Sequence, residues 1–367
     1  MASLRRELPV TLLSGVLVAA AMLPARARAQ DVTDVKPPKS NLVLKESGSF
    51  FVGGHPEHID SAFGSGGEGS SMINQMYFQF QKPATGNDEY PIVFVHGCCL
   101  SSKTWETTPD GRMGWYEYFT RKGFDTYMGD QVGRARSGFN ALEYNRVQAG
   151  VDPGTSNPRI TIATDQFAWN VFRFGDFATK TPWPDERFPM QTVGVGPHSS
   201  LDFYKQVIPD LSTTVGTGSR PIDPGDVWPS ASQMAKLARK LGGAILVGHS
   251  QSSSYPTRAA LFDPTGVKGM IQLETGCFDN LTPAYIDILK KIPLLVMVGD
   301  HFSTPQPPES CITEMQQLKA AGGDMTFIAL PDLGIQGNSH MFMQDNNNLQ
   351  IADIIIDWID KHVEKKH

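Results

Sequence analysis

Short apolar runs recur along this chain and are separated by segments with helical periodicity. Continuous apolar runs of this length, bounded by turn residues, are typical of strands buried on both faces of a sheet. They predict strands at residues 91–97, 244–247, 294–298 and 325–330, and a further strand is predicted at residues 267–273. Nearer the N-terminus, Met76, Phe78 and Phe80 alternate with other residues, which predicts a strand with one buried face within residues 48–81.

Apolar positions spaced three and four residues apart predict helices among these strands. Residues 230–241 are amphipathic, and residues 349–363 place Ile351, Ile355 and Trp358 on one face. Strands that alternate with helices favour an α/β fold with a central, mostly parallel sheet flanked by helices.

Both periodicities disappear between residues 139 and 228, where Pro, Gly and aromatic residues dominate. We expect an inserted cap here, which divides the sheet-forming core into residues 48–138 and 229–367. Its aromatic residues are expected to form the core of the cap more often than the wall of a pocket. They are Phe167, Trp169, Phe172, Phe174, Phe177, Trp183, Phe188, Phe203 and Tyr204.

Residues 1–29 have the features of a cleavable signal peptide. Arg5 and Arg6 give a basic start, residues 10–23 are apolar, and an Ala-x-Ala site ends at Ala29. The apolar stretch is too short for a stable membrane span. We expect export to the periplasm or the medium, with residues 30–47 as a flexible lead-in.

The segment Gly-His-Ser-Gln-Ser at 248–252 lies between the predicted strand 244–247 and a predicted helix at 253–262. A serine in a tight strand-to-helix turn is the nucleophile elbow of α/β-hydrolases, whose usual pattern is G-x-S-x-G. Here Ser252 replaces the second glycine. Ser250 is the candidate nucleophile, and the alternative is an ordinary serine that caps the helix.

Two further segments supply candidates for the oxyanion hole and the general base, in the chain order expected of an α/β-hydrolase. The strand at 91–97 ends in His-Gly, and the next residue, Cys98, is where α/β-hydrolases place one N–H of the oxyanion hole. The residue after the nucleophile, Gln251, supplies the other. His340 lies in a Gly-rich segment after the last predicted strand, where the general base belongs. We expect the neighbouring His96 and His249 to be structural.

The acidic partner of His340 has two candidates. Asp300 follows the strand at 294–298 and occupies the commoner position in the fold, although Asp after Gly is also a frequent turn residue. Glu274 ends the strand at 267–273, where a carboxylate must be paired or functional because burying a bare charge is costly. The residues alone leave both open.

Four motifs together resemble a small group of secreted bacterial esterases. They are Val-His-Gly-Cys-Cys-Leu at 95–100, Thr-Trp-Glu-Thr-Thr-Pro-Asp-Gly-Arg-Met-Gly-Trp at 104–115, the segment at 248–252, and Gly-Asn-Ser-His-Met at 337–341. The group consists of α/β-hydrolases with two adjacent, disulfide-bonded cysteines at the oxyanion hole, and the resemblance extends from about residue 48 to residue 359. It implies a nucleophile, acid and base at Ser250, Glu274 and His340, with oxyanion donors at Cys98 and Gln251.

Export makes the four cysteines candidates for disulfides, and the sequence alone allows three pairings. The resemblance implies Cys98–Cys99 and Cys277–Cys311. A bond between adjacent residues would rigidify the loop that presents the Cys98 N–H. The alternative at this position is two free thiols.

Charge and the remaining histidines bear on whether the protein has a nucleic-acid partner or a metal. A net charge of −6 with 19% charged residues gives no indication of a nucleic-acid partner. His55 and His58 flank Glu57 without further residues at zinc-like spacing, so we expect no metal, and the chemistry requires no cofactor.

The sequence therefore predicts a secreted serine esterase that hydrolyses a small-molecule carboxylic ester through an acyl-enzyme intermediate. It is compatible with a homodimer. The alternatives are the same machinery acting on a lactone, an amide or a polymer ester, and a non-catalytic binding protein on the same fold.

Overall fold

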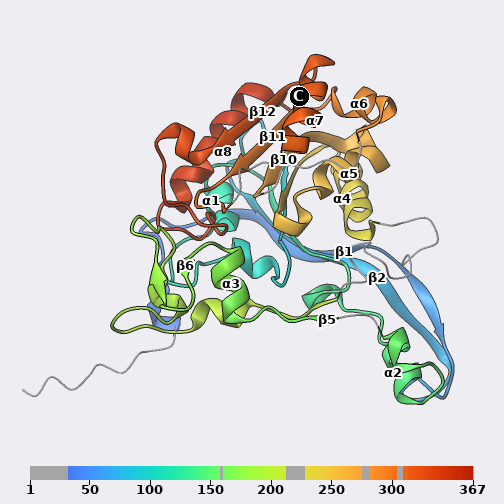
Figure 1. Ribbon diagram of the computed structural model, residues 1–367. Coiled ribbons are helices and arrows are strands. Elements are labelled where there is room, and N and C mark those ends of the chain that lie inside the picture. Colours follow the sequence, from blue (N-terminus) through green and yellow to red (C-terminus); the bar gives the residue numbers. More distant parts are fainter. Residues whose placement is uncertain (1–31, 158–159, 212–227, 275–280, 304–308, 367) are drawn as a thin grey trace, which may run out of the picture.

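The computed structural model describes residues 32–157, 160–211, 228–274, 281–303 and 309–366 (Figure 1). The predicted signal peptide, residues 1–29, lies outside these ranges, as does Cys277.

An eight-stranded sheet forms the centre of the molecule, with the strand order β1-β2-β4-β3-β9-β10-β11-β12. β1 and β2 form an antiparallel hairpin, β2 pairs antiparallel with β4, and the remaining neighbours are parallel. The predicted α/β class with a mostly parallel sheet is confirmed. The strands are β1 Leu44–Ile59, β2 Gly69–Pro83, β3 Ile92–Val95, β4 Thr126–Asp130, β9 Ala244–His249, β10 Val267–Leu273, β11 Leu294–Val298 and β12 Met325–Ala329.

Helices cover both faces of the sheet (Figure 1). On one face, α1 (Trp115–Arg121) and α8 (Asn348–His362) pack on strand residues such as Phe94. On the other face, apolar residues of the remaining core helices pack on strand residues such as Val93. Those helices are α4 Pro229–Lys240, α5 Tyr255–Phe262, α6 Pro283–Leu289 and α7 Glu309–Ala320. Successive residues of β3 thus face opposite layers, which explains its unbroken apolar sequence.

The described part of residues 139–228, the segment expected to form a cap and called the cap below, contains α2 (Leu142–Gln148), α3 (Asp165–Val171) and two small sheets. One pairs β5 (Ile160–Thr161) with β8 (Asp210–Leu211), and the other pairs β6 (Gly175–Asp176) with β7 (Thr181–Pro182). The buried cap aromatics belong to the same apolar cluster as α1 and α8, so the cap packs directly on the core. They are Trp169, Phe172, Phe174, Phe188 and Phe203.

The β1–β2 hairpin extends beyond the sheet, and α2 lies beside its far end (Figure 1). There, the side chain of Asn145 donates a hydrogen bond to the carbonyl of Phe63 (3.3 Å). Within the described residues, no helix combines the length and apolarity needed to cross a bilayer.

Several connections are short 3-10 helices, and one of them alters a predicted boundary. The helix predicted at 253–262 begins at Tyr255, because residues 250–252 form a separate 3-10 turn. The 3-10 helices are η1 Val32–Asp34, η2 Ser102–Trp105, η3 Ala135–Ser137, η4 Gly154–Ser156, η5 Met190–Val193, η6 Asp202–Gln206, η8 Ser250–Ser252, η9 Pro264–Gly266 and η10 Leu330–Leu333.

Candidate active site

Ser250 lies in a sharp turn between β9 and α5. Its φ of 55° is in the left-handed region, which is costly for a residue with a β-carbon and typical of functional turns. Gly248 permits the turn, because a β-carbon there would lie 2.0 Å from the carbonyl oxygen of Ser252. Gly97 permits the approach of the next loop, because a β-carbon there would lie 2.8 Å from Cβ of Ser250.

Ser252 stabilises this turn through its side chain. Its hydroxyl accepts a hydrogen bond from the His249 N–H (2.9 Å) and donates one to the carbonyl of Val95 (2.9 Å). The serine thus ties the turn to the end of the neighbouring strand β3, which gives a physical reason for serine at a position where the elbow usually has glycine.

His340 and Glu274 form a buried hydrogen-bonded pair. Nδ1 of His340 lies 2.9 Å from Oε2 of Glu274, and the other carboxylate oxygen accepts the N–H of Gly299 (2.6 Å). Nε2 of His340 is buried and has no hydrogen-bond partner among the described residues. The pair therefore leaves one imidazole nitrogen available for proton transfer.

Opposing effects of burial and neighbouring charges set the pKa values of Glu274 and His340. Burial by itself raises the pKa of Glu274, but the Arg173 guanidinium and the hydrogen bond from His340 outweigh it and hold the pKa at about 2. Burial lowers the pKa of His340 and Arg173 lowers it further, while Glu274 opposes both. At neutral pH these shifts favour an ionised Glu274 beside a neutral imidazole.

Asp300, the other candidate acid, is engaged elsewhere. Its carboxylate accepts hydrogen bonds from the main-chain N–H groups of His301 (2.7 Å) and Gly337 (3.0 Å). Asp300 thus fixes the segment that leads to His340, whereas Glu274 contacts the imidazole itself.

The Cys98–Cys99 disulfide is present, in the loop that follows β3. Cys99 has a left-handed φ of 61°, and its carbonyl accepts a hydrogen bond from Ile208 of the cap (2.8 Å). The predicted pair Cys277–Cys311 falls partly outside the described residues. Cys311 is buried, and the described residues contain no free cysteine.

The side chain of Gln251 belongs to a buried polar cluster. Arg134 Nη1 donates to its amide oxygen (2.6 Å), and its amide nitrogen donates to Asp210 Oδ2 (3.0 Å). Arg134 and Asp210 also form a fully buried ion pair. An Asp210 carboxylate oxygen also lies within 4.8 Å of the Cys98 and Cys99 sulfurs. Asp210 therefore links the cap to both segments that carry the predicted oxyanion donors, Cys98 and Gln251.

His96 and His249 are buried and hydrogen-bonded within the scaffold. His96 accepts the N–H of Gln131 at Nε2 (3.1 Å), and its Nδ1 lies 2.8 Å from the carbonyl of Gly97. Nε2 of His249 lies 2.9 Å from the carbonyl of His340. Burial lowers the pKa of His96 to about 4 and that of His249 to about 3, so both are neutral at pH 7.

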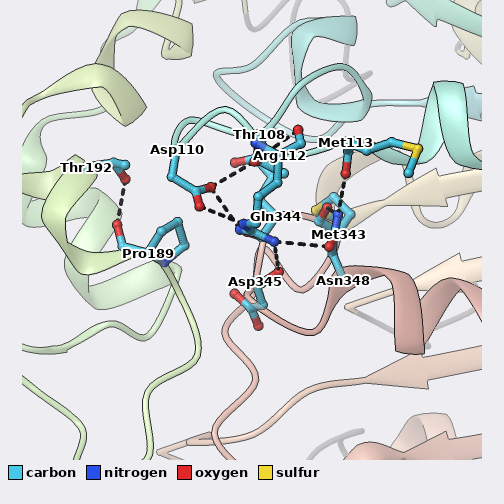
Figure 2. A network of polar contacts seen from close by, with 10 residues as sticks. All are labelled: Thr108, Asp110, Arg112, Met113, Pro189, Thr192, Met343, Gln344, Asp345 and Asn348. Carbon is cyan, nitrogen blue, oxygen red and sulfur yellow. Dashed lines mark hydrogen bonds and ion pairs between the residues drawn. The ribbon is translucent and has the colours of Figure 1, made fainter. Parts of the chain in front are cut away.

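The loop that carries His340 is anchored by the 104–115 motif (Figure 2). Asp110 pairs with Arg112 (2.6 Å), and Arg112 Nη1 donates to the carbonyl of Asp345 (2.8 Å). The Asp345 carboxylate accepts hydrogen bonds from the N–H (2.8 Å) and hydroxyl (2.7 Å) of Ser339. Ser339 directly precedes His340, so this chain of contacts fixes the position of the imidazole.

The sequence analysis did not identify Arg173 or Asp210, although both reach the site from the cap. A signal for Arg173 exists in the sequence, because a charged residue between Phe172 and Phe174 has to be paired if the segment is buried. Asp210 has no comparable local signal.

Two groups of potential metal ligands occur among the described residues. They are Cys98, Cys99 and Asp210, and Asp185, Asp300 and His301. In the first group the sulfurs are bonded to each other and do not offer thiolates. In the second, His301 pairs with Asp185 (2.9 Å) at the edge of the cap. Neither group includes Ser250, Glu274 or His340.

Comparisons with known proteins agree with this geometry. The solved structure of a novel bacterial esterase is similar to this chain at 40% sequence identity and a TM-score of 0.78, covering 89% of this chain and 99% of the other. The probable secreted lipase phiG of a fungal species (strain ATCC 74256) is 26% identical over 376 residues, which cover 88% of this chain and 92% of the lipase. No family model matches the chain.

Proposed function

This chain belongs to the α/β-hydrolase superfamily, among the bacterial esterases, and we propose that it hydrolyses carboxylic esters with Ser250, His340 and Glu274 as its catalytic triad. The observation that carries this proposal is the His340–Glu274 hydrogen bond of 2.9 Å. Ser250 is in a strained elbow, and the ring of the preceding residue, His249, lies 4.8 Å from the His340 ring between centroids.

In the first half-reaction, Ser250 Oγ attacks the carbonyl carbon of the ester, and Nε2 of His340 takes the hydroxyl proton. Nδ1 keeps its own proton throughout and uses it to donate a hydrogen bond to Glu274, which fixes the tautomer and stabilises the imidazolium. The imidazolium then gives its Nε2 proton to the alkoxy oxygen as the C–O bond breaks. The products of this step are the free alcohol and an ester of Ser250.

The tetrahedral intermediate carries a negative oxygen, and the main-chain N–H groups of Cys98 and Gln251 are proposed to stabilise it. Removing one such donor costs roughly 3 kcal/mol in comparable sites. The buried cluster around Arg134 and Asp210 supports this role, because it holds the segments that present both donors.

In the second half-reaction, water attacks the acyl-enzyme and His340 again accepts a proton at Nε2. Collapse of the second intermediate returns that proton to Ser250 and releases the carboxylic acid. Each step uses side chains and main-chain groups of the protein alone, so the mechanism requires no cofactor.

We further propose that the protein is exported through its N-terminal signal peptide. The features of residues 1–29, the Cys98–Cys99 disulfide and the similarity to a probable secreted lipase support this proposal.

The nucleophile is tested with Ser250→Ala, with Ser254→Ala as a matched control four residues further along the chain. Hydrolysis of a panel of aryl and alkyl esters of different chain length should disappear in Ser250→Ala and persist in Ser254→Ala. A phosphonate inhibitor should label Ser250 in the wild type. Residual activity of Ser250→Ala within about tenfold of the wild type would remove Ser250 as nucleophile, because losing this group normally costs far more. An unlabelled Ser250 would favour a binding protein.

A further inference from the structure

A cap arginine contacts the Glu274–His340 pair directly. Arg173 lies between α3 and β6, and its side chain is only 8% exposed. Its φ of 62° is in the left-handed region, where a residue with a β-carbon is strained. A buried charge on a strained residue requires a compensating interaction.

The compensating contacts hold the guanidinium on three sides. Nη1 lies 2.8 Å from Oε2 of Glu274, the oxygen that Nδ1 of His340 also contacts, and 3.2 Å from that Nδ1. Nε donates a hydrogen bond to the carbonyl of Asp300 (2.5 Å), and the guanidinium stacks over the ring of Phe302 (3.8 Å to the centroid). The arginine and the imidazole therefore share one carboxylate oxygen.

This arrangement has two consequences for the imidazole. The guanidinium offsets the charge of Glu274, so that the carboxylate can stay ionised while buried. It also places a second cation against any imidazolium that forms, which disfavours protonation of His340. Nδ1 carries a proton and uses it in the hydrogen bond to Glu274, so it cannot accept a hydrogen bond from Arg173. Arg173 therefore acts on His340 through its charge.

We propose that Arg173 is a positioning residue for ester hydrolysis: it fixes the Glu274 carboxylate for His340 and places a positive charge against the imidazole. This inference rests on the proposed function of the triad.

Other titratable groups also face the pair, but their charges are neutralised or engaged. His249, whose ring centroid is 4.8 Å from that of His340, is neutral because its pKa is about 3. On the cap side, burial raises the pKa of Glu186 to about 9, so it is protonated at pH 7. The carboxylates of Asp300 and Asp345 accept hydrogen bonds from main-chain N–H groups of the His340 loop.

The test compares Arg173→Gln, Arg173→Lys and the control Arg146→Gln. Arg146 is a cap arginine that also pairs with a carboxylate, Asp152 (2.7 Å), but lies outside the site described above. The measurements are kcat and KM for a neutral aryl ester across pH 4.5–9, with the melting temperature of each variant.

Arg173→Gln should lower kcat by roughly tenfold to a hundredfold, the range expected for a misplaced catalytic group. The acidic limb of its kcat/KM profile should move to higher pH by about one unit, because the imidazole loses a repelling charge. Arg173→Lys should restore the limb to near its wild-type position, and Arg146→Gln should match the wild type. An acidic limb that does not move in Arg173→Gln would overturn the proposal, even if activity and melting temperature fall together.

A measurement on the wild type covers the case in which Arg173→Gln does not fold. The C–H resonances of His340, assigned by comparison with His340→Gln, should titrate with a midpoint below the ordinary histidine value of about 6.5, because burial and the Arg173 charge both lower the pKa of His340. A midpoint at or above that value would overturn the proposal.

The phosphonate label separates this inference from the proposed function. If Ser250 is labelled in both the wild type and Arg173→Gln while the acidic limb stays in place, only the role of Arg173 fails. If Ser250 is not labelled in the wild type, the triad itself is wrong and the role of Arg173 fails with it.

Discussion

The carbonyl of Phe172 accepts the main-chain N–H of His340 (3.0 Å), and the phenyl ring lies nearly parallel to the imidazole, with centroids 5.5 Å apart and an interplanar angle of 15°. One cap residue thus fixes both the backbone and the ring of the candidate general base. Because Arg173 follows it, two consecutive cap residues determine the position and the charge environment of the Glu274–His340 pair.

The choice of acid can be tested by comparing Glu274→Gln with Asp300→Asn. Glu274→Gln should lower kcat by about 10⁴, because the imidazole loses its orienting partner and its counter-charge. Asp300→Asn should cost much less, since an amide oxygen can still accept the N–H of Gly337. Steady-state kinetics at pH 8 measure both. The opposite order of effects would assign the acid to Asp300.

The double substitution Cys98→Ser, Cys99→Ser should lower kcat by one to a few orders of magnitude, within the roughly 10²–10³ range for losing one oxyanion donor. The main-chain N–H of Cys98 survives, so some activity should remain. The melting temperature should stay near that of the wild type, because this disulfide closes no long loop of the unfolded chain. Equal activity of variant and wild type would exclude a role for the ring in positioning the donor.

Asp210→Asn should lower kcat more than it raises KM, because Asp210 links the segments of Cys99 and Gln251. It should also destabilise the protein by about 3–5 kcal/mol, since Arg134 is left buried without its counter-charge.

The double variant Arg134→Met, Asp210→Asn separates the two effects of Asp210→Asn. It should recover much of the lost stability without recovering kcat, because the unpaired charge is gone but the Gln251 amide oxygen has lost the hydrogen bond from Arg134 and position 210 no longer carries a carboxylate. Urea unfolding and steady-state kinetics on the same preparations measure the pair of effects. Recovery of kcat together with stability would mean that Asp210 acts only on folding.

Glu186→Gln should become increasingly stabilising as the pH rises. Burial raises the pKa of Glu186 from 4.5 to about 9. A raised folded-state pKa contributes stability that is fully present below pH 4.5 and is lost as the pH rises through 9, at up to about 1.4 kcal/mol per pH unit. Glutamine keeps the neutral form and can still accept the N–H of Phe188.

Calorimetric melting temperatures from pH 4.5 to pH 9 check this prediction, with the exposed Glu364→Gln as the control. The difference between Glu186→Gln and the wild type should be small at pH 4.5 and largest near pH 9. A difference that does not vary with pH would show that Glu186 is ionised in the folded protein at pH 7.

The core strands and the mostly parallel sheet were predictable because the central strands are buried on both faces and are therefore mostly apolar. The carboxyl ends of parallel strands meet at one edge of the sheet, so candidates such as Ser250 and Glu274, both at strand ends, could be expected to lie together. The choice between Glu274 and Asp300 could not be made from local sequence, since it depends on how the segment before His340 folds back onto both strands.

The contributions of the cap were not predictable in the same way. Residues 139–228 have no periodicity from which a face can be assigned. The positions of the aromatic residues described in this range follow from their packing in one apolar cluster with α1 and α8. Asp210 lies in a two-residue strand, too short for any pattern. Its role depends on contacts with Arg134 and Gln251, residues far away along the chain.

The hydrogen bond from Ile208 to the carbonyl of Cys99 has a consequence for the evolution and engineering of this protein. Insertions in α/β-hydrolases are often treated as exchangeable modules that change substrate range while the core keeps its chemistry. Here, replacing the whole insertion would remove Ile208, which donates to the Cys99 carbonyl. It would also remove Phe172, whose carbonyl accepts the His340 N–H. A chimera should therefore retain residues 172–173 and 208–210 as part of the recipient core and vary only the segments between them.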